Sequence, residues 1–328
     1  LRDNGFQFRI DHDLGQSGGW RQQLWGLHSG KDLQLNDIGY LDRNNFNYLR
    51  YEINRRIGSY PETSRYAGSF WRYAASIRYN DRGQHLWDAV AVNRQSETRN
   101  GGNEFWEIAM FGAGHDDLIL RGNGVVKVPE KIISQYEGFW PRRGHWSFYV
   151  ESRIAAEGLE GAKGMGATFY LEPQYHFNDR MNLAVGVGMQ KVPDWLLWQG
   201  GNQLGSFDSE MLELKAAFNW IIGSRQELRV KLQAIGLDAE MKQAWRVAAN
   251  GTPVRSSDAL ADFSLRNLGF QVRYRYELAP LSDLYLVYAR GGAMQDDYAR
   301  GASTQLRDSF YLRDDEQLLV KLSYRFEI

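Results

Sequence analysis

Hydrophobic and polar side chains alternate along many segments of this chain. The pattern is clearest in the last eleven residues, where apolar and aromatic positions alternate with polar ones: Val320, Leu322, Tyr324 and Phe326 against Lys321, Ser323 and Arg325. A period of two predicts a β-strand with one apolar and one polar face. The same alternation recurs over residues 49–57, 71–79, 146–153, 169–177, 182–190, 212–220, 228–233 and 270–277, and more weakly over 6–10, 20–28, 87–94, 105–111 and 284–289. Helical spacing explains none of the strong segments, so the pattern predicts an all-β fold.

Such strands fit either a soluble sandwich or a membrane β-barrel. A barrel strand needs roughly nine or more residues to cross a bilayer at a tilt, which the strong segments supply. The 11 Trp, 18 Tyr and 16 Phe are abundant enough to build interfacial girdles. The mean hydropathy is −0.53, and no continuous apolar run is long enough for a transmembrane helix. We therefore expect residues 1–328 to form a single antiparallel transmembrane β-barrel of the outer-membrane type, with about 14–16 strands.

The connections between the expected strands alternate in length. Short turns are expected near residues 80–83, 100–103, 141–144, 178–180, 223–225 and 279–283, and long polar loops over 29–45, 114–130, 193–206, 238–262 and 291–315. Short turns on one rim and long loops on the other are typical of outer-membrane barrels. The turn at residues 80–83 breaks this pattern, because it is short where a long loop is expected.

The expected number of strands has an unusual parity. We count about fifteen, whereas bacterial single-chain barrels have an even number. This count predicts either one uncounted strand or further strands ahead of Leu1. An exported barrel also needs a signal peptide, and none is visible at Leu1, which favours a mature or truncated start.

The polar faces of the expected strands carry charges of both signs. The candidates for the lumen face are Arg50, Glu52, Arg72, Arg78, Glu151, Arg153, Glu213, Lys215, Arg229, Lys231, Arg273, Arg275, Lys321 and Arg325. One interpretation is a mildly basic pore that prefers anionic solutes. The other is a ladder of salt bridges that fills or stiffens the interior, because unpaired charges in a narrow lumen are costly.

Several blocks of this sequence resemble one protein family. They are NDIGYLDRNNF (Asn36 to Phe46), DDLILRGNG (Asp116 to Gly124), GGNQLGSFDSEMLEL (Gly200 to Leu214), FQVRYRYELAPLSDLYLVYARGG (Phe270 to Gly292) and the terminal LLVKLSYRFEI. The family consists of large, poorly characterised outer-membrane proteins with a family-nine-like carbohydrate-binding domain ahead of a C-terminal β-barrel. The resemblance implies an outer-membrane barrel and sequence ahead of Leu1. The carbohydrate-binding domain has no counterpart in this chain.

Candidate ligand sites are few. Trp195 and Trp198, with Asn202 and Gln203, could stack on and hydrogen-bond a sugar from a glycine-rich loop, or could belong to an interfacial girdle or a loop folded on itself. Asp116 and Asp117 are weak candidates for a divalent cation, against the simpler interpretation of solvated loop acids.

Catalytic signals are also sparse. The six histidines are scattered without metal-binding spacing, and neither a Gly-x-Ser-x-Gly elbow nor a phosphate loop occurs. A membrane hydrolase would need a serine and a histidine that the fold brings together at the lipid-facing rim. We therefore expect no catalytic residues and no cofactor.

The composition narrows the partners. A net charge of −1 argues against a general nucleic-acid binder, and the absence of cysteine fits an envelope protein without deciding the matter. The expected location is the outer membrane of a Gram-negative bacterium, with membrane lipid, lipopolysaccharide and the barrel-assembly machinery as partners. The expected function is a channel or passive transport barrel. The alternatives are a structural or partner-binding barrel within a membrane complex and, less favoured, a membrane-embedded hydrolase.

Overall fold

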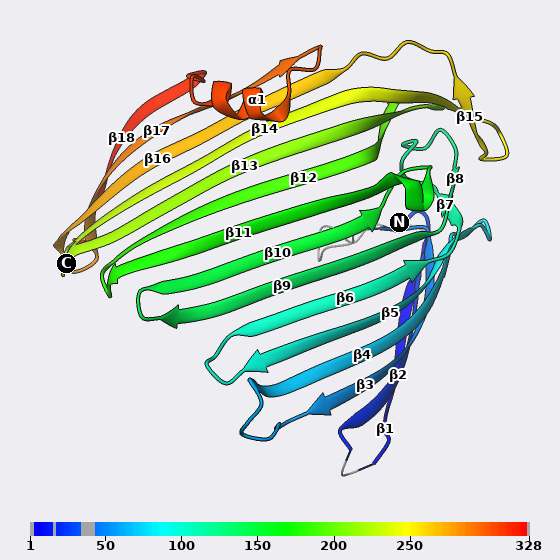
Figure 1. The fold of residues 1–328 in the computed structure, drawn as a ribbon, viewed down its shortest axis with the longest axis horizontal. Coiled ribbons are helices and arrows are strands. Elements are labelled where there is room, and N and C mark those ends of the chain that lie inside the picture. The colour runs from blue at the N-terminus through cyan, green and yellow to red at the C-terminus, as the bar shows by residue number, and fades with distance from the viewer. Residues whose placement is uncertain (1–2, 16–17, 34–42, 327–328) are drawn as a thin grey trace.

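One curved antiparallel sheet dominates the structure (Figure 1), a computed structural model that describes residues 3–15, 18–33 and 43–326. Sequence neighbours pair in order along its path. The strands on this path are β1 (Gly5–Asp13), β2 (Trp20–Ser29), β3 (Phe46–Ile57), β4 (Tyr66–Tyr79), β5 (His85–Thr98), β6 (Asn103–Phe111), β9 (Lys131–Arg143), β10 (Trp146–Ala156), β11 (Met165–Asn178), β12 (Met181–Gly200), β13 (Gln203–Gly223), β14 (Gln226–Val247), β16 (Phe263–Ala279), β17 (Ser282–Asp296) and β18 (Asp315–Ser323). The prediction of an all-β, antiparallel fold is confirmed.

The remaining elements are short and lie at one rim. β15 (Pro253–Ser256) pairs with the end of β14, and β7 (Gly114–Asp116) pairs with β8 (Val126–Val128) in a separate two-stranded sheet. The helical segments are η1 (Gly161–Gly164) and α1 (Ala302–Ser309). Among the described residues, no helix has both the length and the apolar character needed to cross a membrane.

The sheet does not close on itself. Within the described residues, β1 pairs only with β2, and β18 pairs only with β17, so both are edges. The sheet has sixteen strands, and β15 lies off the path, which leaves fifteen in sequence. Because every neighbouring pair is antiparallel, the first and fifteenth strands run in the same direction and cannot pair with each other in antiparallel fashion. The closed barrel expected from the sequence is therefore not formed by these strands alone.

The two rims differ in their connections, with one exception among the predicted long loops. Gly144–His145, Asp179–Arg180 and Ser224–Arg225 are two-residue turns on one rim, hereafter the short-turn rim. On the opposite rim, the expected loop over 193–206 is instead a continuous hairpin, in which β12 and β13 meet at residues 201–202. Gly201 has φ 49° there, a left-handed conformation that glycine adopts at little cost. The strands β12, β13 and β14 are therefore 20, 21 and 22 residues long and extend beyond their neighbours.

Other predicted loops are partly regular structure. β14 and β17 extend into the predicted loops 238–262 and 291–315, and the second loop also contains α1. The segment 114–130 contains β7 and β8. Most of the predicted loop 29–45, including residues 36–42 of the NDIGYLDRNNF block, lies outside the described residues.

The helix α1 packs against the outer surface of the sheet near the rim opposite the short turns. Ala302 and Leu306 lie directly above Gly236 of β14, where an added Cβ would come within 2.3 Å of the Ala302 carbonyl oxygen. Beneath the helix, Arg266 Nη1 of β16 lies 2.7 Å from Asp296 Oδ2 and 2.8 Å from the side-chain oxygen of Gln305. Glycine at position 236 is thus what lets the helix backbone approach the strand.

Candidate functional site

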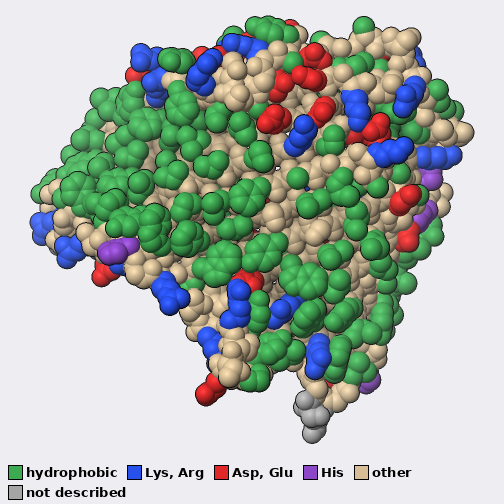
Figure 2. All heavy atoms as spheres, viewed as in Figure 1, with side chains coloured by type: hydrophobic (Ala, Val, Ile, Leu, Met, Phe, Trp, Pro, Cys, Tyr) green, Lys and Arg blue, Asp and Glu red, His purple; other side chains and the backbone are tan. Residues whose placement is uncertain are grey.

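On most strands from β3 to β12, the two faces of the sheet have the reverse of a soluble protein's polarity. On β3, Leu49 and Tyr51 are 45% and 41% exposed, whereas Glu52 and Asn54 on the other face are each 7% exposed. Large apolar side chains are exposed on the same face as Leu49 all along the sheet: Tyr73, Ile77, Val90, Ile108, Met110, Phe148, Ile154, Phe169, Val187, Met189, Leu286, Leu318, Val320 and Leu322. Figure 2 shows hydrophobic side chains spread over much of the surface in view, with charged groups mainly toward its margins. Exposed apolar surfaces of this size are typical of sites that interact with another protein or with a membrane.

Aromatic side chains gather on the apolar face near the short-turn rim. The rings of Trp71 and Trp106 meet edge to face at 5.6 Å, and Trp146 stacks on Phe148 at 6.0 Å. Tyr175 lies 4.9 Å from Trp146, between ring centroids. Trp and Tyr at one level of a sheet are typical of the boundary between hydrocarbon and water.

Cross-strand pairing places the polar residues in rows on the opposite face. One row runs through Arg72, Asn93, Glu107, Gln135 and Arg153, each opposite the next in the register. The amides of Asn93 and Gln135 donate to the two Glu107 oxygens at 3.0 and 3.2 Å. The register places all the charged strand residues singled out from the sequence on this face, except Arg325, which follows the end of β18. That this polar face lines a lumen stays a prediction.

Only some of these charges are paired. Lys215 Nζ lies 3.0 Å from Glu213, and Arg153 Nη1 lies 2.7 Å from Glu157. Among the described residues, no ion pair is formed by Arg78, Lys231, Arg273, Lys321 or Arg325. The guanidinium of Arg78 instead stacks over Trp87 at 3.6 Å from the ring centroid. The polar face is therefore neither a fully salt-bridged ladder nor a row of isolated charges.

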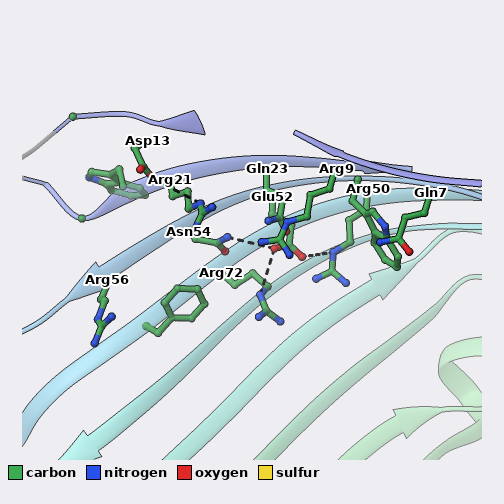
Figure 3. A pocket seen from close by; sticks show the side chains of 15 residues that line it. Gln7, Arg9, Asp13, Arg21, Gln23, Arg50, Glu52, Asn54, Arg56 and Arg72 are labelled. Atoms are coloured by element: carbon green, nitrogen blue, oxygen red, sulfur yellow. Dashed lines mark hydrogen bonds and ion pairs between the residues drawn. The ribbon is translucent and has the colours of Figure 1, made fainter. Parts of the chain in front are cut away.

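A hollow of about 960 Å³ lies on the polar face of β1 to β4, hereafter the N-terminal groove (Figure 3). Its lining contains five arginines and two acidic residues: Arg9, Arg21, Arg50, Arg56, Arg72, Asp13 and Glu52. Glu52 stands at its centre, with one oxygen 2.5 Å from Arg50 Nε and the other 3.6 Å from Arg72 Nε. Asn54 Nδ2 donates to Glu52 at 3.4 Å. One carboxylate therefore serves two guanidinium groups.

A second hollow, of about 580 Å³, lies on the polar face toward the other end of the sheet. Lys215, Lys231, Gln233, Gln271 and Asp315 contribute polar groups to its lining. Both hollows open on the polar face, which indicates that this is the concave side of the sheet.

Three of the four candidate sugar-binding residues lie in strands, and the fourth lies in the two-residue turn between them. Trp195 and Trp198 belong to β12, Asn202 to the turn and Gln203 to β13. Trp198 Nε1 donates to the Gly201 carbonyl at 3.0 Å, and Asn202 Nδ2 donates to the Val247 carbonyl at 2.9 Å. Trp198 packs beside a buried cluster that includes Leu204 and Trp245. The loop placement was wrong because Trp195–Trp198 pair with Leu204–Phe207 across the hairpin, although this stretch lacks the alternation from which strands were predicted.

The two candidate cation ligands already have partners. Asp116 Oδ1 accepts hydrogen bonds from the backbone N–H groups of Leu118 and Ile119 at 2.8 and 2.9 Å. Asp117 pairs with Arg43 and accepts a hydrogen bond from Asn80 Nδ2 at 3.2 Å. In the described part of the chain, no three His, Asp or Glu side chains are arranged to hold a metal ion.

The fold also brings together a serine and a histidine. Ser147 Oγ of β10 lies 3.0 Å from His176 Nε2 of β11, near the short-turn rim. Both side chains belong to the polar face, whereas the expected membrane hydrolase needs its serine and histidine where lipid can reach them. Among the described residues, His176 Nδ1 has no hydrogen-bond partner, so no carboxylate orients the ring as in a catalytic triad.

Asp258, which follows β15, is held by neighbouring hydrogen-bond donors. Arg246 Nε and Nη2 donate to Asp258 at 2.8 and 3.0 Å, and Ser256 and Gln203 donate to the same carboxylate. These hydrogen bonds, those from Arg246 most strongly and then that from Ser256, lower the pKa of Asp258 from 3.8 to about 2. This carboxylate therefore fixes the β15 connection to the end of β14.

Sequence reasoning did not identify the N-terminal groove. It placed Arg50, Glu52 and Arg72 on one face but missed Arg9, Gln23 and Trp25, which join them there. The strands β1 and β2 show only weak alternation, and Gln23 lies opposite Glu52 because of the pairing register. The alternation within each separate segment does not determine this pairing register.

The comparisons identify a family without an assigned activity. A family model described as "Domain of unknown function (DUF5916)" matches residues 2–327. No curated protein matches the chain. The expected resemblance to a poorly characterised family fits this result, whereas the associated carbohydrate-binding domain stays a prediction.

Proposed function

Because this chain belongs to the DUF5916 family, whose description names no activity, we propose a function from the fold itself: an outer-membrane β-barrel that acts as a channel or passive transport barrel with a charged polar lumen. The observation that carries the proposal is the reversed polarity of the sheet. Apolar side chains such as Val187 are exposed on one face, while polar ones such as Glu52 and Asn54 are buried on the other. A lipid-facing exterior around a wet interior accounts for both faces, as in transmembrane barrels.

The proposal includes closure of the sheet into a barrel in the membrane. Every backbone group at membrane depth must be hydrogen-bonded, and open edges in hydrocarbon are not tolerated. Since β1 and β18 run in the same direction, antiparallel closure needs an odd number of further strands between them. One such strand would bring the path to sixteen, an even number like those of bacterial barrels.

The proposed location is the outer membrane of a Gram-negative bacterium. Lipid and lipopolysaccharide would contact the apolar face, and the aromatic groups around Trp71, Trp106 and Trp146 would lie at the interface near the short-turn rim. The barrel-assembly machinery would insert the chain.

Conductance tests the channel directly. The purified chain, folded into planar bilayers, is expected to produce discrete ion currents. Protease protection of the same preparation in vesicles establishes insertion independently. An inserted chain that carries no current would overturn the channel and favour the second candidate, a structural barrel that binds a partner. The unpaired edges, nine residues each in β1 and β18, are the observation in favour of that alternative.

A further inference from the structure

The N-terminal groove has more guanidinium groups than carboxylates to neutralise them. Arg9 and Arg21 share Asp11, with Arg9 Nε at 2.9 Å and Arg21 Nη2 at 3.1 Å. Arg50 and Arg72 share Glu52. Four arginines of the groove therefore pair with three carboxylates: Glu52 and Asp13 of the lining, and Asp11 beside it.

The fifth arginine of the groove, Arg56, increases this excess. It forms no ion pair with any residue that the structure describes, and in Figure 3 it lies apart from the Glu52 cluster. Asp13 lies 3.7 Å from Arg21 but remains largely exposed at the sheet edge, with its side chain 83% accessible. The lining therefore keeps a net positive charge, even if every ion pair is complete.

The groove also holds donors without acceptors. Trp25 Nε1 and Arg72 Nε are both shielded and have no hydrogen-bond partner among the described residues. Arg50 Nε lies close to Glu52 but is not aligned for a hydrogen bond, so it too is short of an acceptor. Shielded donors are costly when unpaired, so the arginine-rich lining is short of acceptors.

Apolar rings complete the lining. Trp20, Trp25 and Phe70 line the same hollow, and the guanidinium of Arg72 lies 5.7 Å from the Phe70 ring centroid. The hollow's volume of about 960 Å³ lies within the range of sites that hold small organic molecules. A ligand that fits therefore combines an anionic group with a carbon skeleton.

From these features we infer that the N-terminal groove is a binding site for small organic anions, with Arg56 and Arg72, which flank Phe70, receiving a carboxylate or phosphate group and the Phe70 ring contacting the carbon skeleton. This inference rests on the proposed function and names its solute class. The planar guanidinium group of arginine hydrogen-bonds equally well to a carboxylate and to a phosphate. The feature that the two ligand classes share is a pair of anionic oxygens. Neutral sugars of the same size lack the group that the arginines receive.

Calorimetric titration of the full chain, folded in detergent, tests the site without requiring a current. Gluconate and glucose 6-phosphate serve as the carboxylate and phosphate probes, and glucose is the neutral control. We expect at least one of the two anions to bind at least about tenfold more tightly than glucose, the factor expected for one charge-assisted hydrogen bond. Equal affinity for glucose and both anions would overturn the inference.

Two variants locate the site. Arg56→Gln removes a guanidinium that has no ion pair, so folding should be unaffected, and Arg72→Gln removes the weaker partner of Glu52. Each is expected to weaken anion binding about tenfold. The matched control is Arg142→Gln, which removes a positive charge paired with Asp179 at the short-turn rim, away from the groove. Unchanged anion affinity in both groove variants would overturn the assignment.

Bilayer currents separate this inference from the proposed function. In a KCl gradient, the reversal potential of the native chain should indicate anion preference, and Arg56→Gln should reduce that preference. Anion binding without any current would leave the site standing and remove the channel. Current without anion preference or anion binding would keep the channel and overturn the site.

Discussion

Val187 of β12 lies directly opposite Leu214 of β13, and both point to the apolar face of the sheet. Val187 is 55% exposed although it stands on a central strand, where a soluble sheet would bury it. The next residue, Gly188, lies opposite Glu213 on the polar face. A single step along the strand therefore separates the two environments on which the membrane proposal depends.

Val187→Arg tests the assignment of the apolar face to lipid. A charge at the middle of the lipid-facing surface is expected to cost about 2–4 kcal/mol of folding free energy. Reversible unfolding in lipid vesicles, followed by tryptophan fluorescence, measures this loss. The control is Ala217→Arg on the neighbouring strand. The Ala217 side chain points to the polar face, so this substitution should lower the folding free energy less. If Val187→Arg is harmless, the apolar face does not contact lipid.

Gly236→Val tests how α1 packs against the sheet. A Cβ at this position would come within 2.2–2.3 Å of the backbone of Ala302 and Leu306, so the helix must move. We expect a loss of about 1–3 kcal/mol, as for other insertions into packed sites. Faster amide exchange over residues 302–309 should accompany it. Gly269→Val, at a position with open space around its Cβ, is the control and should leave α1 unchanged.

Much of the fold could be predicted because alternation is a local signal. Residues such as Lys215 and Leu214 reveal their faces from their immediate neighbours, and the strand class follows from period two. The register and the lengths of the extended strands could not be predicted in this way. Gly200 and Gly201 resembled loop glycines, yet they form the tip of a long hairpin. The seat of α1 depends on Gly236, which is 66 residues before Ala302 and carries no signal by itself.

The residues of the candidate site also fall into those that local alternation predicts and those that it does not. Arg50, Glu52 and Arg72 could be assigned to a polar face, but the groove also depends on Arg9 and Trp25 from strands with weak alternation. Their approach follows from pairs such as Trp25 with Arg50, which only the register defines. Long-range pairing therefore decides which polar residues share a hollow. The pairing register of distant strands cannot be derived from the alternation in a single sequence.

The Asp258 carboxylate should make the β15 segment, residues 253–258, sensitive to acid. Its folded pKa of about 2 lies below the unfolded value, so its contribution to stability is present above about pH 4 and is lost as the pH falls through about 2. We expect amide exchange over residues 253–258, corrected for intrinsic rates, to increase more between pH 4 and pH 2 than elsewhere in the sheet. Asp258→Asn should remove this local pH dependence. If Asp258→Asn responds to acid as the native chain does, another group controls the segment.

Ser147→Ala tests whether the Ser147–His176 pair has a chemical role. The pair lies on the polar face, and His176 Nδ1 has no partner in the described chain, so we expect no catalysis. Phospholipid and p-nitrophenyl ester substrates should be hydrolysed no faster by the native chain than by Ser147→Ala. Hydrolysis by the native chain that disappears in Ser147→Ala, but persists in Ser152→Ala, would revive the membrane hydrolase.

The direction of the edge strands makes a final prediction about barrel closure. β1 and β18 run parallel, and direct closure would make them neighbours; Ile10 and Val320 are the sixth residues of these nine-residue strands, so closure with the strand ends aligned would bring them together. If instead an odd number of antiparallel strands fills the gap, these positions lie too far apart for a disulfide, which needs Cα atoms within about 7 Å. The double variant Ile10→Cys, Val320→Cys should therefore remain unlinked under mild oxidation in vesicles. The positive control is Ile10→Cys, Leu24→Cys, because these residues are cross-strand partners within the sheet. Rapid linkage of Cys at 10 and 320 would establish direct parallel closure and remove the need for another strand.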